Sequence, residues 1–260
     1  MLPRRSVLSV LLIVVLFVLG SEAVPFTTAA AEYSVVCTGD YHACAIRDDR
    51  STVCWGSNDD GQLGLDHDYD DYIGQPDYAD GPSELGDALV ALDLGTDGDG
   101  NDLTAKSLSC GVAHTCAVLS DDTLKCWGNN GDGQLGLDHD YDIGDGSEPD
   151  LNRRRLQAEM GDALPAVSLG TDSDGNDLTA KSVSCGYEHT CAVLSDDTIK
   201  CWGENNSGQL GLDHDDDIGD GEDVARRRLL QTEMGDNLPA VDLGTDSDGN
   251  DLTAKSVSCG

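Results

Sequence analysis

The sequence predicts an all-β protein made of small sheets repeated in series, which is the architecture of a β-propeller. A stretch that begins at Cys185 returns almost unchanged at Cys110 and in a looser form at Cys37, so one structural unit recurs along the chain. The 260 residues include 31 glycines and only 5% aromatic residues. This balance is typical of proteins with many turns and short strands.

Each copy of the repeat has the pattern of four short strands. In the third copy, apolar residues alternate over 181–185, 189–194 and 198–202, with aspartate-rich turns between them. A fourth strand is expected at 166–169 and again at 240–243. Cys110 and Cys185 are 75 residues apart, and Cys185 and Cys259 are 74 apart. We therefore divide the chain into units at 34–109, 110–184 and 185–258, with a fourth unit that starts at 259.

Three motifs recur in every full unit. In the third copy they are Cys-Gly-x-x-His-Thr-Cys-Ala-Val-Leu from Cys185, Lys-Cys-Trp-Gly from Lys200 and Gly-Gln-Leu-Gly-Leu from Gly208. Together they resemble the repeat of the regulator of chromosome condensation family. The resemblance implies a seven-bladed propeller of four-stranded blades that binds other proteins. Residues 34–260 supply about three blades, so we expect a fragment of a longer ring, with open strand edges.

The N-terminus has the features of a secretory signal peptide. Arg4 and Arg5 precede an apolar run from Ser6 to Gly20, and a short segment with small residues ends at Ala23. The run is short for a membrane span, which needs roughly 20 apolar residues. We therefore predict a signal peptide at 1–23, a linker at 24–33, and a secreted, extracellular or lumenal protein with no stable membrane span after cleavage.

The charge of the chain restricts its partners. Fifty acidic residues against fifteen basic ones give a formal net charge of -35. Such a field repels nucleic acid and anionic membranes, and it opposes a role on chromatin. We expect a protein partner that is basic or bridged by a metal ion, and no nucleic acid.

The cysteines are spaced C-x5-C-x9-C in the second and third copies and C-x6-C-x9-C in the first. This spacing lacks the short cysteine pairs of zinc sites, and disulfides persist in a secretory compartment. A three-residue hairpin loop at 195–197 would place Cys191 opposite Cys201, whereas a two-residue loop would place them on opposite faces. With the longer loop we predict three disulfides: Cys44–Cys54, Cys116–Cys126 and Cys191–Cys201. Four cysteines are then left reduced or paired outside this set, namely Cys37, Cys110, Cys185 and Cys259.

One histidine and one tryptophan recur in each copy. A residue copied into every unit has the same role in every unit, whereas catalysis needs a single site. We therefore interpret the histidines as structural and predict no enzymatic activity. We expect the tryptophans to fill the space between blades, where an aromatic side chain buries the most area. The residues are His42, His114 and His189, and Trp55, Trp127 and Trp202.

Alternating aspartates are the candidate ligand-binding residues. Calcium accepts six to eight oxygen ligands in variable geometry, so carboxylates on loops could bind it. Neither set has the spacing of an EF-hand loop, and a solvated loop without metal is the alternative. One set comprises Asp138, Asp140 and Asp142, Asp213, Asp215 and Asp217, and Asp66, Asp68 and Asp70. The other comprises Asp172, Asp174 and Asn176, with equivalents at Asp97, Asp99 and Asn101 and at Asp246, Asp248 and Asn250.

Two arginine clusters, 153–155 and 226–228, lie within the acidic insertions. They could compensate the neighbouring charge, attract an anionic partner or be processed by a protease.

These observations favour a secreted or lumenal propeller that acts as a protein–protein interaction scaffold. The alternative is a calcium-binding structural or adhesion protein. By family resemblance alone, a third hypothesis is a regulator of the guanine-nucleotide exchange type.

Overall fold

The computed structural model describes residues 33–66, 73–74, 85–146, 158–223, 228–229 and 232–260. The predicted signal peptide lies outside these residues, as do all but the last residue of the predicted linker. The first arginine cluster, most of the second, and Asp68 and Asp70 lie outside them as well. None of the helices in the described ranges is long and apolar enough to cross a membrane.

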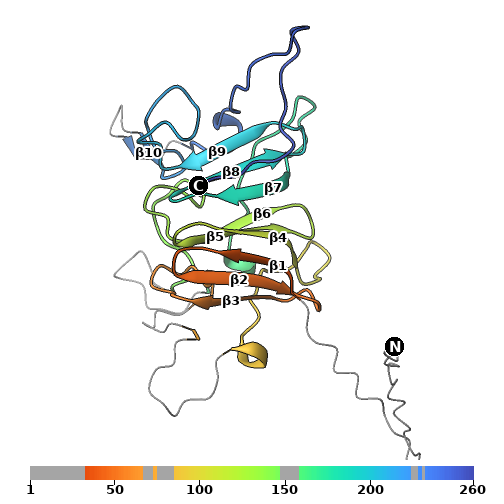
Figure 1. Cartoon of the computed structure of the whole chain (residues 1–260), viewed down its shortest axis with the longest axis vertical. Coiled ribbons are helices and arrows are strands. Elements are labelled where there is room, and N and C mark those ends of the chain that lie inside the picture. The colour runs from red at the N-terminus through yellow and green to blue at the C-terminus, as the bar shows by residue number, and fades with distance from the viewer. Residues whose placement is uncertain (1–32, 67–72, 75–84, 147–157, 224–227, 230–231) are drawn as a thin grey trace, which may run out of the picture. The chain divides into compact units, whose positions relative to one another are not determined.

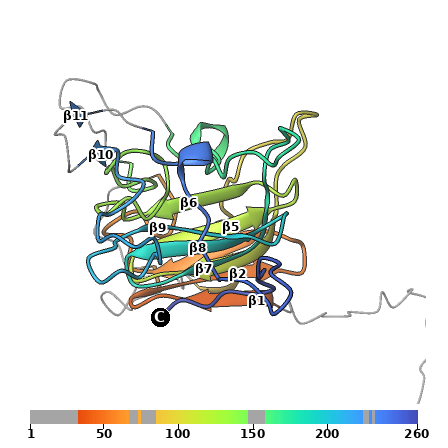
Figure 2. The same ribbon diagram turned by 90° about the horizontal axis from the view of Figure 1, so that it is seen from above.

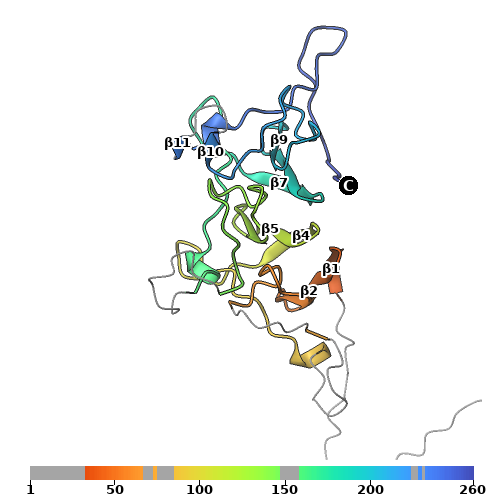
Figure 3. The same cartoon turned by 90° about the vertical axis from the view of Figure 1, so that its left-hand side faces the viewer.

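Three antiparallel sheets of three strands each make up the described chain. Figure 1 shows them side by side in chain order, and Figure 3 shows the same arrangement from the side. The first sheet, blade 1, contains β1 (Tyr33–Thr38), β2 (His42–Arg47) and β3 (Thr52–Gly56). Blade 2 contains β4 (Ala105–Cys110), β5 (His114–Leu119) and β6 (Leu124–Gly128). Blade 3 contains β7 (Ala180–Cys185), β8 (His189–Leu194) and β9 (Ile199–Gly203).

The remaining elements are short. A two-stranded hairpin consists of β10 (Glu222–Asp223) and β11 (Arg228–Leu229). Each blade is followed by a 3₁₀ turn: η1 (Gly86–Ala88), η2 (Gly161–Ala163) and η3 (Gly235–Asn237). Strands β1, β4 and β7 are neighbours, so the first strands of successive blades line one side of the array. The all-β, partial-propeller prediction is confirmed, and the sheets begin at 33, 105 and 180 rather than at the repeat cysteines.

The hairpins have the three-residue loop, which is the loop length that places the two cysteines opposite each other. In blade 3, Val193 pairs with Ile199, and the loop residues are 195–197. The third loop position has left-handed backbone, with φ of 68° at Asp197, 69° at Asp122 and 69° at Arg50. A turn of this length that ends in a left-handed residue is a common hairpin connection. The register therefore places Cys191 opposite Cys201.

The predicted fourth strand is wrong in detail. The segments at 166–169 and 240–243 run beside β6 and β9, but none is part of a described sheet. Each makes one backbone hydrogen bond to the neighbouring strand, from Val167 N to Leu124 O and from Val241 N to Ile199 O, both 2.8 Å. Blade 1 has the same arrangement, with one hydrogen bond from Leu92 N to Thr52 O at 2.8 Å, although Val90 stands where the other blades have Pro165 and Pro239. A segment that forms no ladder is not a strand, although it occupies the fourth position of the blade.

The apolar core lies between the blades. Trp127 of blade 2 packs in one cluster with Leu63 and Met160, and Trp202 of blade 3 packs in another with Leu135 and Met234. Both indole rings are fully buried, whereas Trp55 is half-buried beside Ala45, Val53 and Leu89. The prediction that tryptophans fill the space between blades is confirmed for Trp127 and Trp202.

Candidate protein-binding face

A hydrogen-bond network repeats at both junctions between blades. At the first junction, between blades 1 and 2, His42 Nε2 lies 2.9 Å from Thr115 Oγ1. The Thr115 hydroxyl donates to the carbonyl of Gln62 at 3.0 Å, and Trp127 Nε1 donates to the same carbonyl at 3.1 Å. Because the threonine proton is used on the carbonyl, the histidine must donate from Nε2. The network therefore fixes the tautomer of His42.

The second junction, between blades 2 and 3, has the same network. His114 Nε2 lies 3.0 Å from Thr190 Oγ1, and Thr190 Oγ1 and Trp202 Nε1 donate to the carbonyl of Gln134 at 2.9 and 3.0 Å. Burial lowers the pKa of His114 to about 3 and that of His42 to about 4. Both imidazoles are neutral at pH 7. The role of these histidines is structural, as the sequence predicts.

The glycine of the repeat motif makes room for this histidine. A side chain at Gly111 would collide with the ring of His114, and one at Gly186 would collide with the ring of His189. The spacing Cys-Gly-x-x-His thus has a packing reason, because the imidazole folds back over the glycine.

The cysteines of each hairpin lie at disulfide-bonding distance. In all three pairs the α-carbons are 4.1 Å apart: Cys44–Cys54, Cys116–Cys126 and Cys191–Cys201. A fourth pair, Cys37–Cys110, joins blade 1 to blade 2 with α-carbons 5.5 Å apart. The cysteine spacing predicts only that these two residues are reduced or paired outside the hairpins. The sequence feature that indicates this pair is the extra residue between the first two cysteines of the first copy. Because of it, Cys37 lies opposite Cys44, whereas in blade 2 Ser109 lies opposite the equivalent Cys116.

Two cysteines, Cys185 and Cys259, are free thiols. Cys185 N donates to Ser109 Oγ at 2.9 Å, and its Sγ donates to Ser109 O at 3.3 Å. Burial raises the pKa of Cys185 to about 12 and also raises the pKa of Cys259. A buried thiol that resists deprotonation is a poor nucleophile.

Among the described residues, the groups of three side chains whose candidate metal ligands converge contain cysteine and histidine rather than aspartate. One example is His114, Cys116 and Cys185. Each such group includes a sulfur at disulfide-bonding distance from another cysteine, and a disulfide sulfur does not supply the thiolate that metal binding needs.

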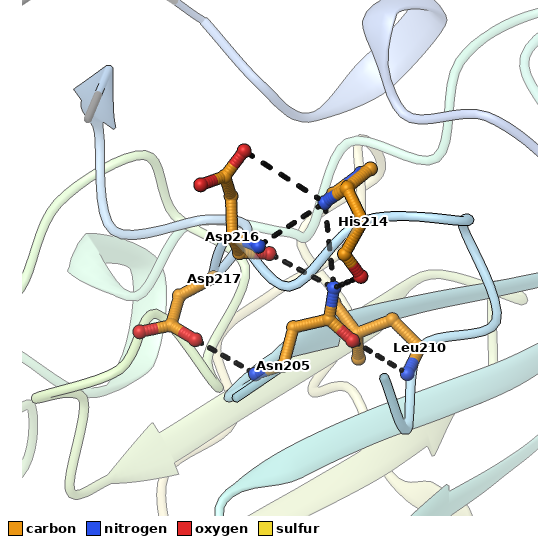
Figure 4. Close-up of polar contacts among 5 residues, drawn as sticks. All are labelled: Asn205, Leu210, His214, Asp216 and Asp217. Carbon is orange, nitrogen blue, oxygen red and sulfur yellow. Dashed lines mark hydrogen bonds and ion pairs between the residues drawn. The ribbon is translucent and has the colours of Figure 1, made fainter. Parts of the chain in front are cut away.

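The aspartate loop of blade 3 is organised by Asn205 (Figure 4). Asn205 N donates to Asp217 Oδ1 at 2.7 Å, and Asn205 Nδ2 donates to the carbonyls of His214 and Asp216 at 2.9 and 3.0 Å. Leu210 N donates to Asn205 Oδ1 at 3.0 Å. The side-chain amide of Asn205 therefore fixes the loop through hydrogen bonds to its backbone.

The corresponding loop of blade 2 uses Asn130 in the same way. Asn130 N donates to Asp142 Oδ1 at 2.8 Å. Burial, with a smaller contribution from nearby acidic groups, raises the pKa of Asp142 to about 6. Of the alternating aspartates in these two loops, Asp140, Asp213 and Asp215 are exposed.

Asp138 links blades 2 and 3. Its Oδ1 accepts hydrogen bonds from the backbone N–H groups of Glu233 and Met234 at 2.7 and 3.0 Å. Glu233 Oε2 in turn accepts from Gly219 N at 2.8 Å. Burial raises the pKa of Glu233 to about 7, and Asp220 and Asp138 add to the effect. Asp66 and Glu159 form the same arrangement at the first junction.

The second set of aspartates forms self-contained turns. Asp172 Oδ1 accepts from the N–H groups of Asp174 and Asn176, both at 2.9 Å, and Asn176 Nδ2 donates to Asp172 Oδ2 at 3.0 Å. These hydrogen bonds lower the pKa of Asp172, with the Asn176 side chain as the largest cause. The structure thus places Asp172 and Asn176 in contact within one exposed turn.

The loops between the first and second strands of successive blades meet edge to edge. Asp40 N donates to Val112 O at 3.4 Å, and Val112 N donates to Tyr187 O at 3.3 Å. The loops that follow the third strands join them, since Glu204 N donates to Glu188 O at 2.8 Å. Seen from above in Figure 2, the blades overlie one another, so equivalent loops gather at the same end. We call the loops 39–41, 111–113, 186–188, 57–61, 129–133 and 204–208 the loop face.

The loop face is acidic and carries exposed aromatic rings. Tyr41 is 74% exposed and Tyr187 is 57% exposed. Burial raises the pKa of Glu188, and the nearby charges of Asp132 and Glu204 raise it further. Burial likewise raises the pKa of Asp132, with Glu204 among the contributing charges. These carboxyl groups repel one another, and a cation bound among them would relieve that repulsion.

Residues 34–62, 105–134 and 180–209 match the regulator of chromosome condensation (RCC1) repeat. Each match begins within one residue of a blade's first strand and ends in the loop after its third strand. The chain therefore contains three RCC1 repeats. The resemblance read from the cysteine, tryptophan and glycine motifs is therefore confirmed.

Other proteins with RCC1 repeats are similar over most of the described blades. The ultraviolet-B receptor UVR8 of Arabidopsis thaliana is 28% identical over 179 residues, which cover 69% of this chain and 31% of the receptor. The probable E3 ubiquitin-protein ligase HERC3 of Homo sapiens is 29% identical over 209 residues, which cover 80% of this chain and 15% of the ligase. The chain thus spans about a third or less of these relatives.

Among solved structures, human WBSCR16 aligns with a TM-score of 0.50 at 18% identity, covering 89% of this chain and 43% of WBSCR16. An identity this low supports the fold alone.

Proposed function

We propose that this chain is a secreted or lumenal RCC1-repeat scaffold that binds a basic protein segment on its loop face. The observation that carries the proposal is the convergence of Asp132, Glu188 and Glu204 across the second junction. The exposed Tyr187 directly precedes Glu188 of this group, and tyrosine is enriched among residues that dominate binding energy at interfaces. Electrostatic complementarity to such a surface favours lysine- and arginine-rich partners.

A lysine-rich peptide titrated calorimetrically into the chain tests the proposal. The double variant Asp132→Asn/Glu188→Gln should bind roughly tenfold more weakly, because charged contacts at an interface contribute to both affinity and encounter rate. The charge-matched control is Asp99→Asn/Asp174→Asn, which removes two carboxylates from exposed turns away from the loop face. An equal loss in both variants would show that only net charge matters and would contradict a specific face.

Calcium binding is a second proposal, for the turns of the second aspartate set. It is supported by the exposure of Asp174 and Asn176 beside the half-buried Asp172, and by the return of the same turn at 97–101 and 246–250. Calorimetric titration of calcium into the metal-stripped chain measures it directly. Uptake near one ion per turn, with a rise in melting temperature, would support the proposal. The absence of heat and of any shift would remove it.

Secretion is proposed from residues 1–23, and the cysteine pairs support it because disulfides persist in oxidising compartments. Expression in secreting cells should release protein whose first residue follows Ala23. Retention of the whole chain inside the cell would contradict this.

An exchange-type regulator remains a hypothesis from family resemblance. The repeats support a protein-interaction or regulatory role in general. The proposal includes no enzymatic step, since the similarity to the ligase covers only 15% of that protein.

A further inference from the structure

A cleft lies at the end of the first junction that is opposite the loop face. It has a volume of about 490 Å³ and is lined by residues of the β2–β3 turn, the start of β4 and the β5–β6 turn. Clefts of this size hold small molecules. Its polar lining includes Ser34, Arg47, Arg50, Lys106 and Ser120.

Two of these residues depart from the repeat. Arg50 occupies the left-handed third position of its turn, where the other two blades have Asp122 and Asp197. Arg47 is the residue at the strand end where blade 2 has Leu119. Because Arg50 and Arg47 differ from the equivalent residues of the other blades, they do not have the structural role that the repeat gives to those positions. The two arginines therefore distinguish the β2–β3 turn from the equivalent turns of blades 2 and 3.

At the second junction the positions of Arg47 and Arg50 are occupied by Leu119 and Asp122, so both arginines are absent there. In blade 3, Lys181 Nζ is paired with Asp197 Oδ1 at 2.7 Å. Blade 1 has Arg50 in place of that aspartate and Ser34 in place of the lysine, so the basic group lies on the turn instead of on the strand.

The basic groups of the cleft are held in different ways. Arg47 Nη2 donates to the carbonyl of Gly86 at 2.8 Å, which fixes the side chain. Lys106 Nζ is paired with Asp122 Oδ1 at 2.6 Å. The backbone N–H of Arg50 donates to Arg47 O at 2.8 Å, but within the described ranges its guanidinium makes no hydrogen bond or ion pair. Its planar guanidinium is thus available to a ligand, and this group binds tetrahedral and planar oxyanions through two parallel hydrogen bonds.

We propose that this cleft binds the phosphate or sulfate group of a small-molecule ligand, with Arg50 as the principal donor. The lining holds three basic side chains against the single carboxylate of Asp48, in a chain whose net charge is -35. Asp122 compensates Lys106, so the two arginines supply the excess positive charge. Ser120 Oγ already accepts from Thr104 N at 3.3 Å, so its proton is free to reach an oxyanion. The overall negative field disfavours large polyanions, which limits the ligand to a small one.

Calorimetric titration of inorganic phosphate, sulfate, a phosphorylated monosaccharide and a sulfated monosaccharide into the chain tests the proposal. Arg50→Asp should weaken binding by roughly tenfold or more, because it removes a charge-assisted pair. The variant should fold, since aspartate occupies the same backbone conformation in the other two turns. Lys181→Glu is the control, because it changes the net charge equally at the other junction.

Binding that is lost in Arg50→Asp and retained in Lys181→Glu supports the proposal, and the ranking of the four probes identifies the ester. No binding by the unaltered chain overturns it. Equal affinity in Arg50→Asp, or equal loss in both variants, overturns it as well.

Discussion

The two junctions between blades share one hydrogen-bond network but are closed differently. At the first junction Cys37 and Cys110 lie at disulfide-bonding distance. At the second, Ser109 occupies the place of Cys37, and Cys185 reaches it through two hydrogen bonds. The backbone is nearly the same in both, because Cys37 faces Cys44 as Ser109 faces Cys116. One side chain therefore decides whether the contact between two blades is covalent.

The comparison also shows which parts of the repeat are interchangeable. The histidine, threonine and tryptophan of the network bury polar groups whose partners come from the next blade, so losing one leaves another unsatisfied. The cysteine–serine position and the arginine turn lie at the margins of the junction, where a substitution changes chemistry without disturbing the core.

The largest effect is expected from truncation of the buried tryptophans. Trp127→Ala and Trp202→Ala should each lower the free energy of unfolding by roughly 3–5 kcal/mol, because a large cavity opens between blades. Trp55→Ala should cost less, since that ring is half-buried. Denaturant titrations measure all three. Unequal losses at Trp127 and Trp202 would show that the junctions are not equivalent in packing.

Removal of the disulfide between blades should have the next largest effect. Cys37→Ser gives the first junction the serine–cysteine pair of the second. It should lower the free energy of unfolding by roughly 2–4 kcal/mol, because the link closes a loop of 73 residues in sequence. Urea titration under oxidising conditions measures this loss. Under reducing conditions the variant and the unaltered chain should have the same stability, and a persisting difference would contradict the cross-link.

The reciprocal change should create a second link. Ser109→Cys is expected to pair with Cys185 and to stabilise the chain by about 1 kcal/mol. Peptide mapping without reduction detects the new bond. Ser107→Cys, two residues earlier in β4, serves as the control. Cross-linking in the control, or an unpaired Cys185 in Ser109→Cys, would refute the equivalence of the two positions.

The smallest effect is a dependence on pH. The folded-state pKa of His114 is about 3, below the ordinary value of 6.5, so the unfolded chain binds the proton more tightly. The stability that depends on neutral His114 is present in full above pH 6.5 and is lost as the pH falls from there toward 3. Near pH 5.5 the loss should be about 1 kcal/mol per buried histidine.

Melting His114→Gln and the unaltered chain across this range isolates the contribution of His114. Glu159 and Glu233, whose pKa values are raised to about 7, act in the opposite direction but are present in both proteins. The variant should therefore lose less stability on acidification. Parallel pH profiles would show that the folded chain protonates His114 without cost.

The hydrogen-bond partners of the alternating aspartates could not be predicted from the residue pattern. Alternation along the loops predicts Asp138, Asp142 and Asp217 as calcium ligands. It did not indicate that each of them accepts hydrogen bonds from backbone N–H groups. The partners come from other segments, up to 96 residues away in the case of Asp138 and Met234.

The sequence by itself determined the number of repeats, the strands of each hairpin and the facing of Cys191 and Cys201. These features depend on residues within about ten positions, where turn length and strand alternation act locally. The tertiary structure alone decided the Cys37–Cys110 pair, the histidine–threonine network, the incomplete fourth strand and the basic cleft. The cysteine pair, the network and the cleft depend on contacts that form only when one blade packs against the next. The fourth strand position depends on segments of one blade that are far apart in sequence, such as Val167 and Leu124.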